Sequence, residues 1–249
     1  LFAWRKTSLK SLRRSCILPL ILAFIAGIAL VAGGMRNLNA IICLALCVFV
    51  LGTIFEEFFR GALVRVKSRK ENFLAALLNL TLKNKRRYGG YIIHLAVVLM
   101  FAGFAGNAFN REATEYMKTG QEFQLGDYSL KMTGFQEGQT PNYDYGRVVL
   151  DVYKDGKKID ILKPEKRIFK TGSRQTTTTV ALRSTPKEDL YVVFAGMLND
   201  RVTCEIKANV NPLVYWIWIG AAVMVFGTVV TLLPDRKSVV VREQIEDAP

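Results

Sequence analysis

The sequence contains one histidine and four cysteines among its 249 residues. No stretch has the spacing of a P-loop, a dinucleotide-binding fingerprint, a nucleophile elbow or a zinc site. These absences argue against a soluble hydrolase. Cys16, Cys43 and Cys47 lie in apolar segments, which excludes a disulfide framework. The remaining cysteine, Cys204, is expected to be a buried strand residue.

Hydrophobic residues make up 51% of the chain and are concentrated in four runs without charged residues. These runs are residues 16–34, 40–55, 88–106 and 212–234. A helix needs about 20 apolar residues, at about 1.5 Å each, to cross the hydrocarbon core of a bilayer, so we expect four transmembrane helices. The first run is longer than the apolar region of a signal peptide, and a second span follows it directly. Because the chain starts with Leu1 rather than Met, we expect a truncated, processed or partial sequence.

The net charge of +13 comes from two segments that flank the apolar runs. Residues 1–14 carry five Lys or Arg and no acid, and residues 60–87 carry nine against the single acid Glu71. Basicity of this size could indicate a nucleic-acid partner. The positive-inside rule explains it better, because both segments lie beside spans and would share the cytoplasmic side. We therefore expect membrane lipid, and no nucleic acid, to meet these residues.

The spans and the charge bias together predict a multi-pass protein of the cytoplasmic (inner) membrane. We expect seven segments: a cytoplasmic basic segment (1–14), a transmembrane helical hairpin (15–59), a cytoplasmic basic loop with an amphipathic helix (60–87), a transmembrane helix (88–106), an extracytoplasmic β domain (107–211), a last transmembrane helix (212–234) and a cytoplasmic tail (235–249). The β domain is nearly neutral, with sixteen basic and fourteen acidic residues. Long domains are translocated largely regardless of charge, so its basic residues do not oppose this topology.

Residues 71–84 predict a helix with one apolar side. It could lie on the cytoplasmic membrane surface, where basic residues meet anionic lipid, or pack against other cytoplasmic segments. Aromatic residues at span ends favour the membrane interface. We expect this role for Tyr215, Trp216 and Trp218 on the outer side, and for Tyr88 and Tyr91 on the inner side.

The segment 107–211 has the pattern of antiparallel strands. Residues 148–153 and 158–162 flank an Asp-Gly turn, which is a strong hairpin signal. Further strands are expected in residues 123–135, 175–184, 189–194 and 201–210, with a second turn at Gly126-Asp127. We predict six to eight strands in a small sandwich or an open barrel.

The single histidine, His94, lies within the third apolar run, about 9 Å along the helix from Tyr88. Ionisable groups at such depth are costly and indicate a functional site, and imidazole is a usual ligand of haem iron. The alternative is a histidine that hydrogen-bonds to a neighbouring helix. A second axial histidine would have to come from outside this sequence. Gly89, Gly90, Gly103 and Gly106 would allow a neighbouring helix, or a flat macrocycle, to approach closely.

Two further pairs of residues are candidates near His94. Arg86 and Arg87 lie one to two turns below it and could contact haem propionates, although inner-leaflet anchoring explains them as well. Cys43 and Cys47 are spaced i, i+4 on one face of the second span. They could bind a metal, but small apolar packing is the more common role of such cysteines.

Four stretches in order resemble the CcmF-type haem lyases of cytochrome c maturation. They are Leu1-Phe2-Ala3-Trp4-Arg5-Lys6, Arg86-Arg87-Tyr88-Gly89-Gly90-Tyr91-Ile92-Ile93-His94-Leu95-Ala96, Glu188-Asp189-Leu190-Tyr191-Val192-Val193, and Asn211-Pro212-Leu213-Val214-Tyr215-Trp216-Ile217-Trp218-Ile219-Gly220 with the following Leu232-Leu233-Pro234-Asp235. The matches cover this chain from end to end, but only the C-terminal part of the family's longer sequence.

The resemblance implies that His94 is one axial ligand of a transmembrane haem b, whose second histidine is not in this chain. It implies that the complete protein takes haem as substrate from a haem chaperone and attaches it to the Cys-x-x-Cys-His motif of apocytochrome c by thioether bonds. The implied partners are the N-terminal part of the lyase, the haem chaperone, and apocytochrome c with its chaperone and thioredoxin-like subunits. The family's tryptophan-rich segment and outer histidines do not occur here, so this chain alone should not catalyse attachment.

Two other functions remain open at this point. The chain could be a non-catalytic scaffold whose outer β domain docks partners in cytochrome c assembly; such a scaffold needs no iron ligand. A transporter subunit would require polar residues facing a cavity from several spans, and the first and last spans carry almost none.

Overall fold

The computed structural model describes residues 9–171 and 174–234, with the side chains of the first helix described from residue 15 onward. The expected tail (235–249) and most of the expected N-terminal basic segment (1–14) therefore lie outside the described residues. The chain forms two compact units. One unit comprises residues 1–105 and 216–249, and the other comprises residues 106–215.

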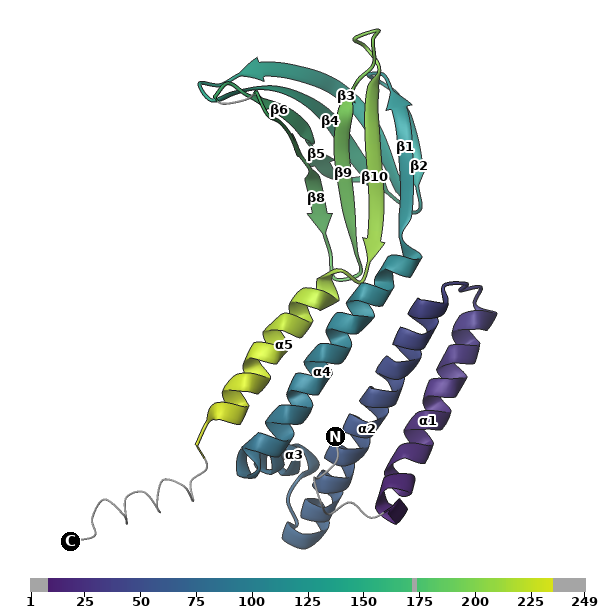
Figure 1. The fold of residues 1–249 in the computed structure, drawn as a ribbon, viewed down its shortest axis with the longest axis vertical. Helices are drawn as coiled ribbons and strands as arrows, with labels where there is room; N and C mark the ends of the chain where they lie inside the picture. The colour runs from purple at the N-terminus through teal and green to yellow at the C-terminus, as the bar shows by residue number, and fades with distance from the viewer. Residues whose placement is uncertain (1–8, 172–173, 235–249) are drawn as a thin grey trace, which may run out of the picture. The chain divides into compact units, whose positions relative to one another are not determined.

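Helices make up the first unit (Figure 1). They are α1 (Leu9–Ala32), α2 (Leu38–Arg69), α3 (Phe73–Lys83), α4 (Lys85–Ala105) and α5 (Tyr215–Leu232). By length and composition, α1, α2, α4 and α5 can each cross a membrane. The predicted four spans are confirmed, and the chain is a multi-pass membrane protein.

The second span differs from its expected bounds, because α2 continues to Arg69 through residues that were assigned to a loop. No proline interrupts residues 56–69, and Glu56 pairs with Arg60 one turn later. The helix ends where Lys70 adopts a left-handed conformation and donates its backbone N–H to Val66 O. The basic segment 60–87 is therefore mostly helical.

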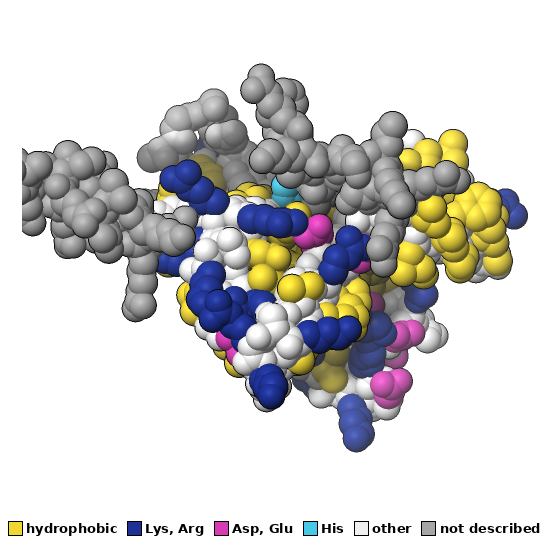
Figure 2. Space-filling model, turned by 90° about the horizontal axis from the view of Figure 1, so that it is seen from below, with side chains coloured by type: hydrophobic (Ala, Val, Ile, Leu, Met, Phe, Trp, Pro, Cys, Tyr) yellow, Lys and Arg dark blue, Asp and Glu magenta, His cyan; other side chains and the backbone are white. Residues whose placement is uncertain are grey.

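The short helix α3 packs against neighbouring helices on one side and exposes leucines on the other. Ala76 and Leu80 are buried, and Leu80 packs with Ile54 of α2 and Tyr88 of α4. On its other side Leu74, Leu78 and Leu82 are spaced i, i+4 and are at least 59% exposed. An exposed leucine stripe on a helix beside basic residues is typical of an interfacial helix. Figure 2 shows Lys and Arg side chains spread over this end of the molecule.

The expectation that Tyr88 and Tyr91 form an interfacial belt is wrong. Both residues are buried, at 4% and 6% exposure, and their rings lie 5.8 Å apart. The ring of Phe58 on α2 packs edge-on against both, with centroid distances of 5.0 and 6.1 Å. Aromatic packing of this kind stabilises the contact between α2 and α4.

The contact between α4 and α5 depends on glycine. A Cβ at Gly220 would lie 2.8 Å from Ala96 O, and one at Gly227 would lie 3.0 Å from Ile93 N. Small residues let two membrane helices approach to backbone contact, where dispersion contacts hold them together. The glycines of α5 therefore set its packing against α4.

The second unit is an antiparallel β sandwich. Its strands are β1 (Arg111–Met117), β2 (Glu122–Leu125), β3 (Tyr128–Gln139), β4 (Tyr143–Lys154), β5 (Lys157–Leu162), β6 (Glu165–Phe169), β7 (Thr176–Thr179), β8 (Ala181–Ser184), β9 (Glu188–Met197) and β10 (Cys204–Pro212). A short 3-10 helix, η1 (Gly106–Phe109), precedes them. One sheet has the order β1-β10-β9-β8; the other has the order β2-β3-β4-β6-β7, with β5 also paired to β4.

The predicted sandwich is confirmed, but the described residues contain ten strands rather than six to eight. The predicted run 123–135 divides into β2 and β3 at the Gly126-Asp127 turn. Strands β1 and β6 were missed because each contains three charged residues, which obscure the apolar alternation. In each of these strands it is the pairing, with β10 or with β4, that stabilises the extended conformation.

Side chains from both sheets form the core of the sandwich. Leu130, Leu150, Val192 and Ile206 are completely buried, as is the thiol of Cys204 on β10. The acids Glu165 and Glu188 are also buried, but they are paired. Glu165 accepts hydrogen bonds from Arg147 and Arg167, and Glu188 accepts from Lys154 and Tyr128. Although burial raises the pKa of each carboxyl group, these hydrogen bonds outweigh it, and both pKa values are lowered.

A truncation in this core tests the sandwich. Leu150→Ala should lower the free energy of unfolding of the β domain by about 2–5 kcal/mol, because it removes buried methyl groups and leaves a cavity. Leu182→Ala on β8 is the matched control, since that side chain is 53% exposed. Denaturant titrations of the purified chain, followed by β-sheet circular dichroism, would measure both. Equal losses for the two variants would contradict the assigned core.

Candidate functional site

His94 lies on α4, and its side chain is exposed on the surface of the helical unit. Its ring Nδ1 lies 2.7 Å from the carbonyl oxygen of Gly90, one turn earlier on the same helix. The i, i+4 spacing produces this contact, because a side chain on a helix tilts toward the preceding turn.

The contact determines which ring nitrogen carries the proton. A carbonyl oxygen can only accept a hydrogen bond, so Nδ1 of His94 must donate. In the neutral imidazole, Nε2 is then unprotonated and has a free lone pair. This tautomer is the form of histidine that coordinates a metal through Nε2, with the other nitrogen held by a carbonyl.

Space is available beside the ring because of Gly90. A Cβ added at Gly90 would meet no atom within 4 Å, whereas one at the adjacent Gly89 would lie 2.3 Å from Thr231 Oγ1. The two glycines therefore have different roles. Gly89 allows α5 to approach, and Gly90 leaves the His94 side of α4 without a side chain.

A groove of about 420 Å³ runs from His94 along α2 and α4. Its wall on α2 includes Ile42, Leu46 and Val50, and its wall on α4 includes Val97 and Phe101. The surface is almost entirely apolar apart from His94, Asn39 and the two cysteines. A concave apolar site with one placed polar group is typical of small-molecule and cofactor sites. The donor and the groove therefore fit a flat, largely apolar, iron-bearing ligand such as haem.

The pair Cys43 and Cys47 lies in the wall of this groove. The thiol of Cys43 donates to Phe101 O at 3.6 Å, and that of Cys47 donates to Val98 O at 3.8 Å. Both bonds join α2 to α4. Among the described residues no three His, Cys, Asp or Glu side chains gather as metal ligands.

The structure places Arg87 on the same face of α4 as His94, two turns below it. Its guanidinium donates to Glu57 of α2 at 2.6 Å and lies 5.8 Å from the ring centroid of Tyr88. Half of its side chain remains exposed. Arg86 is exposed and has no ion pair within the described part of the chain. Contacts of either arginine with propionates stay a prediction. Arg87 would then bind a propionate while it also pairs with Glu57.

Sequence reasoning found His94 but missed the α2 wall of the groove. Ile42, Leu46 and Val50 are ordinary apolar residues of a span, and nothing in their pattern marks the side that faces His94. Only the packing of α2 on α4, through the aromatic contacts at Phe58, determines that side.

The fold and site define a multi-pass membrane protein with a β-sandwich domain between two of its spans. Residues 108–212 match the family described as the CcmF C-terminal beta-sandwich. The chain is 28% identical over 249 residues to the cytochrome c-type biogenesis protein CcmF of Haemophilus influenzae. This match covers 95% of this chain and 35% of the relative. It is 27% identical over 183 residues to CcmF of Pseudomonas aeruginosa, covering 73% of this chain and 27% of the relative.

A solved structure of the cytochrome c haem lyase CcmF is similar in fold, with a TM-score of 0.68 and 21% identity over 94% of this chain and 36% of the other. The resemblance expected from the sequence is therefore confirmed: residues 108–212 form a domain of the CcmF C-terminal β-sandwich family, and the chain is similar to the C-terminal part of the CcmF-type proteins. It spans about a third of the length of these relatives.

The adjacent glycines provide a test of the open face. Gly89→Ala should destabilise the helical unit by about 1–3 kcal/mol, because its Cβ would meet Thr231 Oγ1 and lie 3.2 Å from Gly227 O. Gly90→Ala meets no atom and should leave the stability unchanged or raise it by up to about 1 kcal/mol, because alanine favours a helix more than glycine does. Thermal denaturation of the purified chain in detergent would compare the two. If Gly90→Ala were as damaging as Gly89→Ala, the open space beside His94 would be ruled out.

Proposed function

We propose that this chain supplies the C-terminal part of a cytochrome c haem lyase, in which His94 is an axial ligand of a haem b within the membrane. The observation that carries the proposal is the hydrogen bond from Nδ1 of His94 to Gly90 O, which leaves Nε2 free beside an apolar groove. The names of the similar proteins, cytochrome c-type biogenesis protein and cytochrome c haem lyase, support the choice of reaction class.

The chain's own residues have three tasks at this site. His94 offers Nε2, and Gly90 both orients the imidazole and leaves its side of the helix open. The apolar walls of α2 and α4 exclude water from that side. Haem, when bound, supplies one-electron exchange, for which a water-poor surrounding and a nitrogen ligand tune the potential. The second axial histidine would come from outside this chain.

In this proposal the basic ends of the helices lie at the cytoplasmic face of the inner membrane, and residues 107–211 lie on the outer side. The β domain would then face the compartment where haem is joined to the Cys-x-x-Cys-His motif of apocytochrome c. The haem chaperone, the rest of the lyase, and apocytochrome c with its chaperone and thioredoxin-like subunits are the proposed partners. A scaffold role for the β domain is compatible with this arrangement, but a scaffold alone would need no iron ligand.

Haem content tests the assignment of His94. In the complex purified with its remaining lyase segments, His94→Ala should abolish the b-type haem absorbance, because no other histidine in this chain can replace the ligand. Val225→Ala, at an exposed position of α5 that does not line the groove, is the control and should retain the haem. An unchanged spectrum in His94→Ala would refute the role of this residue.

Filling the open face gives an independent test at the neighbouring position. Gly90→Leu keeps the histidine and the helix but places a side chain beside its ring, where the glycine now leaves space. We expect haem content to fall while the amount of folded protein, measured by size exclusion, stays constant. Full haem occupancy in Gly90→Leu would show that the ligand does not approach from this side.

A further inference from the structure

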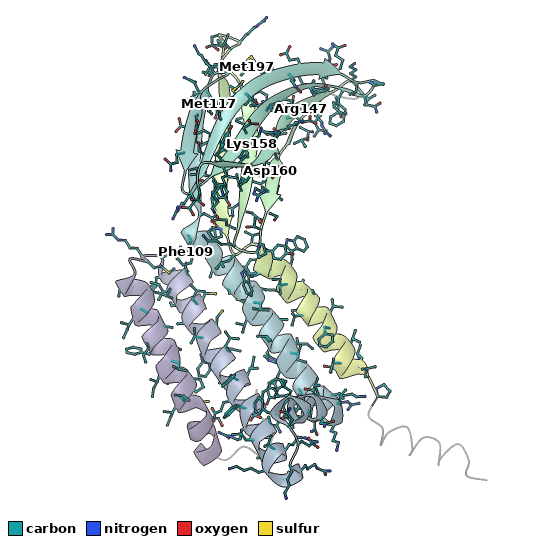
Figure 3. All side chains as sticks on the ribbon, turned by 180° about the vertical axis from the view of Figure 1, so that it is seen from behind. Phe109, Met117, Arg147, Lys158, Asp160 and Met197 are labelled. Carbon is teal, nitrogen blue, oxygen red and sulfur yellow. The ribbon has the colours of Figure 1, made fainter. Side chains whose placement is uncertain are left out.

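The β domain contains a large cleft that the proposed haem site does not use. Its volume is about 890 Å³, and it lies between the inner face of the six-stranded sheet and the end of β9. In Figure 1, β3, β4 and β6 curve over, so that this inner face is concave. Figure 3 labels Met197, which lies at the end of β9 beside the cleft.

One edge of β9 is unpaired where it borders this cleft. Strand β9 pairs with β10 from Glu188 to Met197, with a bulge at Ala195, but with β8 only from Asp189 to Val192. Within the described residues, the β8 side of residues 193–197 therefore has no strand partner. The reason is visible in the chain order: before β8, residues 176–179 form β7 and pair with β6 of the other sheet. The strand that could have covered this edge belongs to the opposite layer.

The carbonyl of Ala195 shows that backbone groups on this edge are available to a partner. Ala195 lies at the bulge of β9, and its carbonyl accepts a hydrogen bond from Nζ of Lys166 on β6, at 2.7 Å. Lysine is a common means of blocking an open strand edge against unwanted pairing. A long, flexible side chain can leave such a position when another donor arrives. The edge is thus blocked in a reversible way.

The side chains around the edge indicate what kind of chain would fit. Ile168 and Leu198 are 45% and 44% exposed, and Phe135 and Met197 are partly buried beside them. Such a surface suits apolar side chains on alternate positions of an extended peptide.

The charges in the cleft favour a basic partner. Three acids, Glu137, Asp144 and Glu205, line it, whereas Lys166 is its only basic residue within the described part of the chain. Asp144 already pairs with Lys170 and Glu205 with Lys207, whereas Glu137 is exposed and has no ion pair within the described residues. Charge complementarity of this kind selects partners and speeds their encounter.

The hairpin between β9 and β10 holds one wall of the cleft in place. The carboxylate of Asp200 accepts hydrogen bonds from the Thr203 hydroxyl and from the backbone N–H groups of Thr203 and Val202. The Thr203 hydroxyl and these N–H groups lower the pKa of Asp200 to about 2. The turn is therefore ordered before any partner arrives, which reduces the entropy cost of binding.

We propose that this cleft binds an extended polypeptide segment, carrying apolar and basic side chains in alternation, by strand addition to residues 193–197 of β9. Its backbone N–H groups replace Lys166 at the edge, and its basic side chains meet Glu137 and the neighbouring acids. Only the identity of the natural ligand, an unfolded apocytochrome, rests on the proposed function. Binding itself requires neither haem nor His94.

Peptide binding to the full chain in detergent tests the proposal. The probe is a dye-labelled synthetic peptide of alternating valine and lysine without cysteine, followed by fluorescence anisotropy. A peptide with glutamate in place of lysine should bind about tenfold more weakly or worse. N-methylation at one set of alternate positions should abolish binding and at the other set should not, because only one set of N–H groups faces β9.

Variants of residues in the cleft test whether the peptide binds there. Glu137→Lys should weaken the lysine peptide about tenfold, and Lys166→Met should strengthen it several-fold by freeing Ala195 O. Glu112→Lys on β1 is the matched control, since it makes the same charge change at an exposed position outside the cleft and should have little effect. Equal affinities for the two N-methylated series, or equal effects of Glu137→Lys and Glu112→Lys, would overturn the proposal.

A last comparison separates this proposal from the haem assignment. His94→Ala should bind the peptide as the unaltered chain does, while its haem absorbance in the complex is lost. In the unaltered protein, peptide binding without a haem signal would show that the haem assignment has failed. A haem signal without peptide binding would show that the peptide proposal has failed.

Discussion

The hydrogen bond between Nδ1 of His94 and the carbonyl of Gly90 is the interaction on which the functional account depends. It exists because the two residues are one helical turn apart, and it fixes the tautomer that leaves Nε2 unprotonated. An ionisable side chain within a span is costly, and one held in this way is oriented for a ligand outside the helix. The packing of α2 and α5 on α4 then decides which side of the histidine stays open.

The two units are stabilised by different kinds of contact. In the helical unit, glycines of α4 and α5 allow backbone contact, and the aromatic cluster of Phe58, Tyr88 and Tyr91 holds α2 against α4. In the β domain a conventional apolar core, with paired buried acids, supports a curved sheet and an incompletely covered strand. The first arrangement presents a nitrogen donor in an apolar groove, and the second presents backbone groups in a cleft open to water.

Much of this architecture could be predicted from the sequence, because apolar runs and the Asp-Gly turn are local signals. The spans, the sandwich class and the place of His94 within a span were predicted in this way. The bounds of α2 and the burial of Tyr88 and Tyr91 were not, since they depend on contacts between helices distant in sequence. The charged strand β1 was missed for a similar reason: its extended form depends on pairing with β10. The groove wall at Leu46 and the open edge of β9 carry no local signal at all.

Chemical rescue of a His94→Gly variant tests the central claim most directly. The variant would be purified as the full complex, and imidazole would then be added together with haem while the b-type absorbance is recorded. If His94 is an axial ligand beside an open groove, the variant should lack haem and free imidazole should restore the signal. Haem that persists without imidazole, or that imidazole fails to restore in a folded complex, would contradict the account.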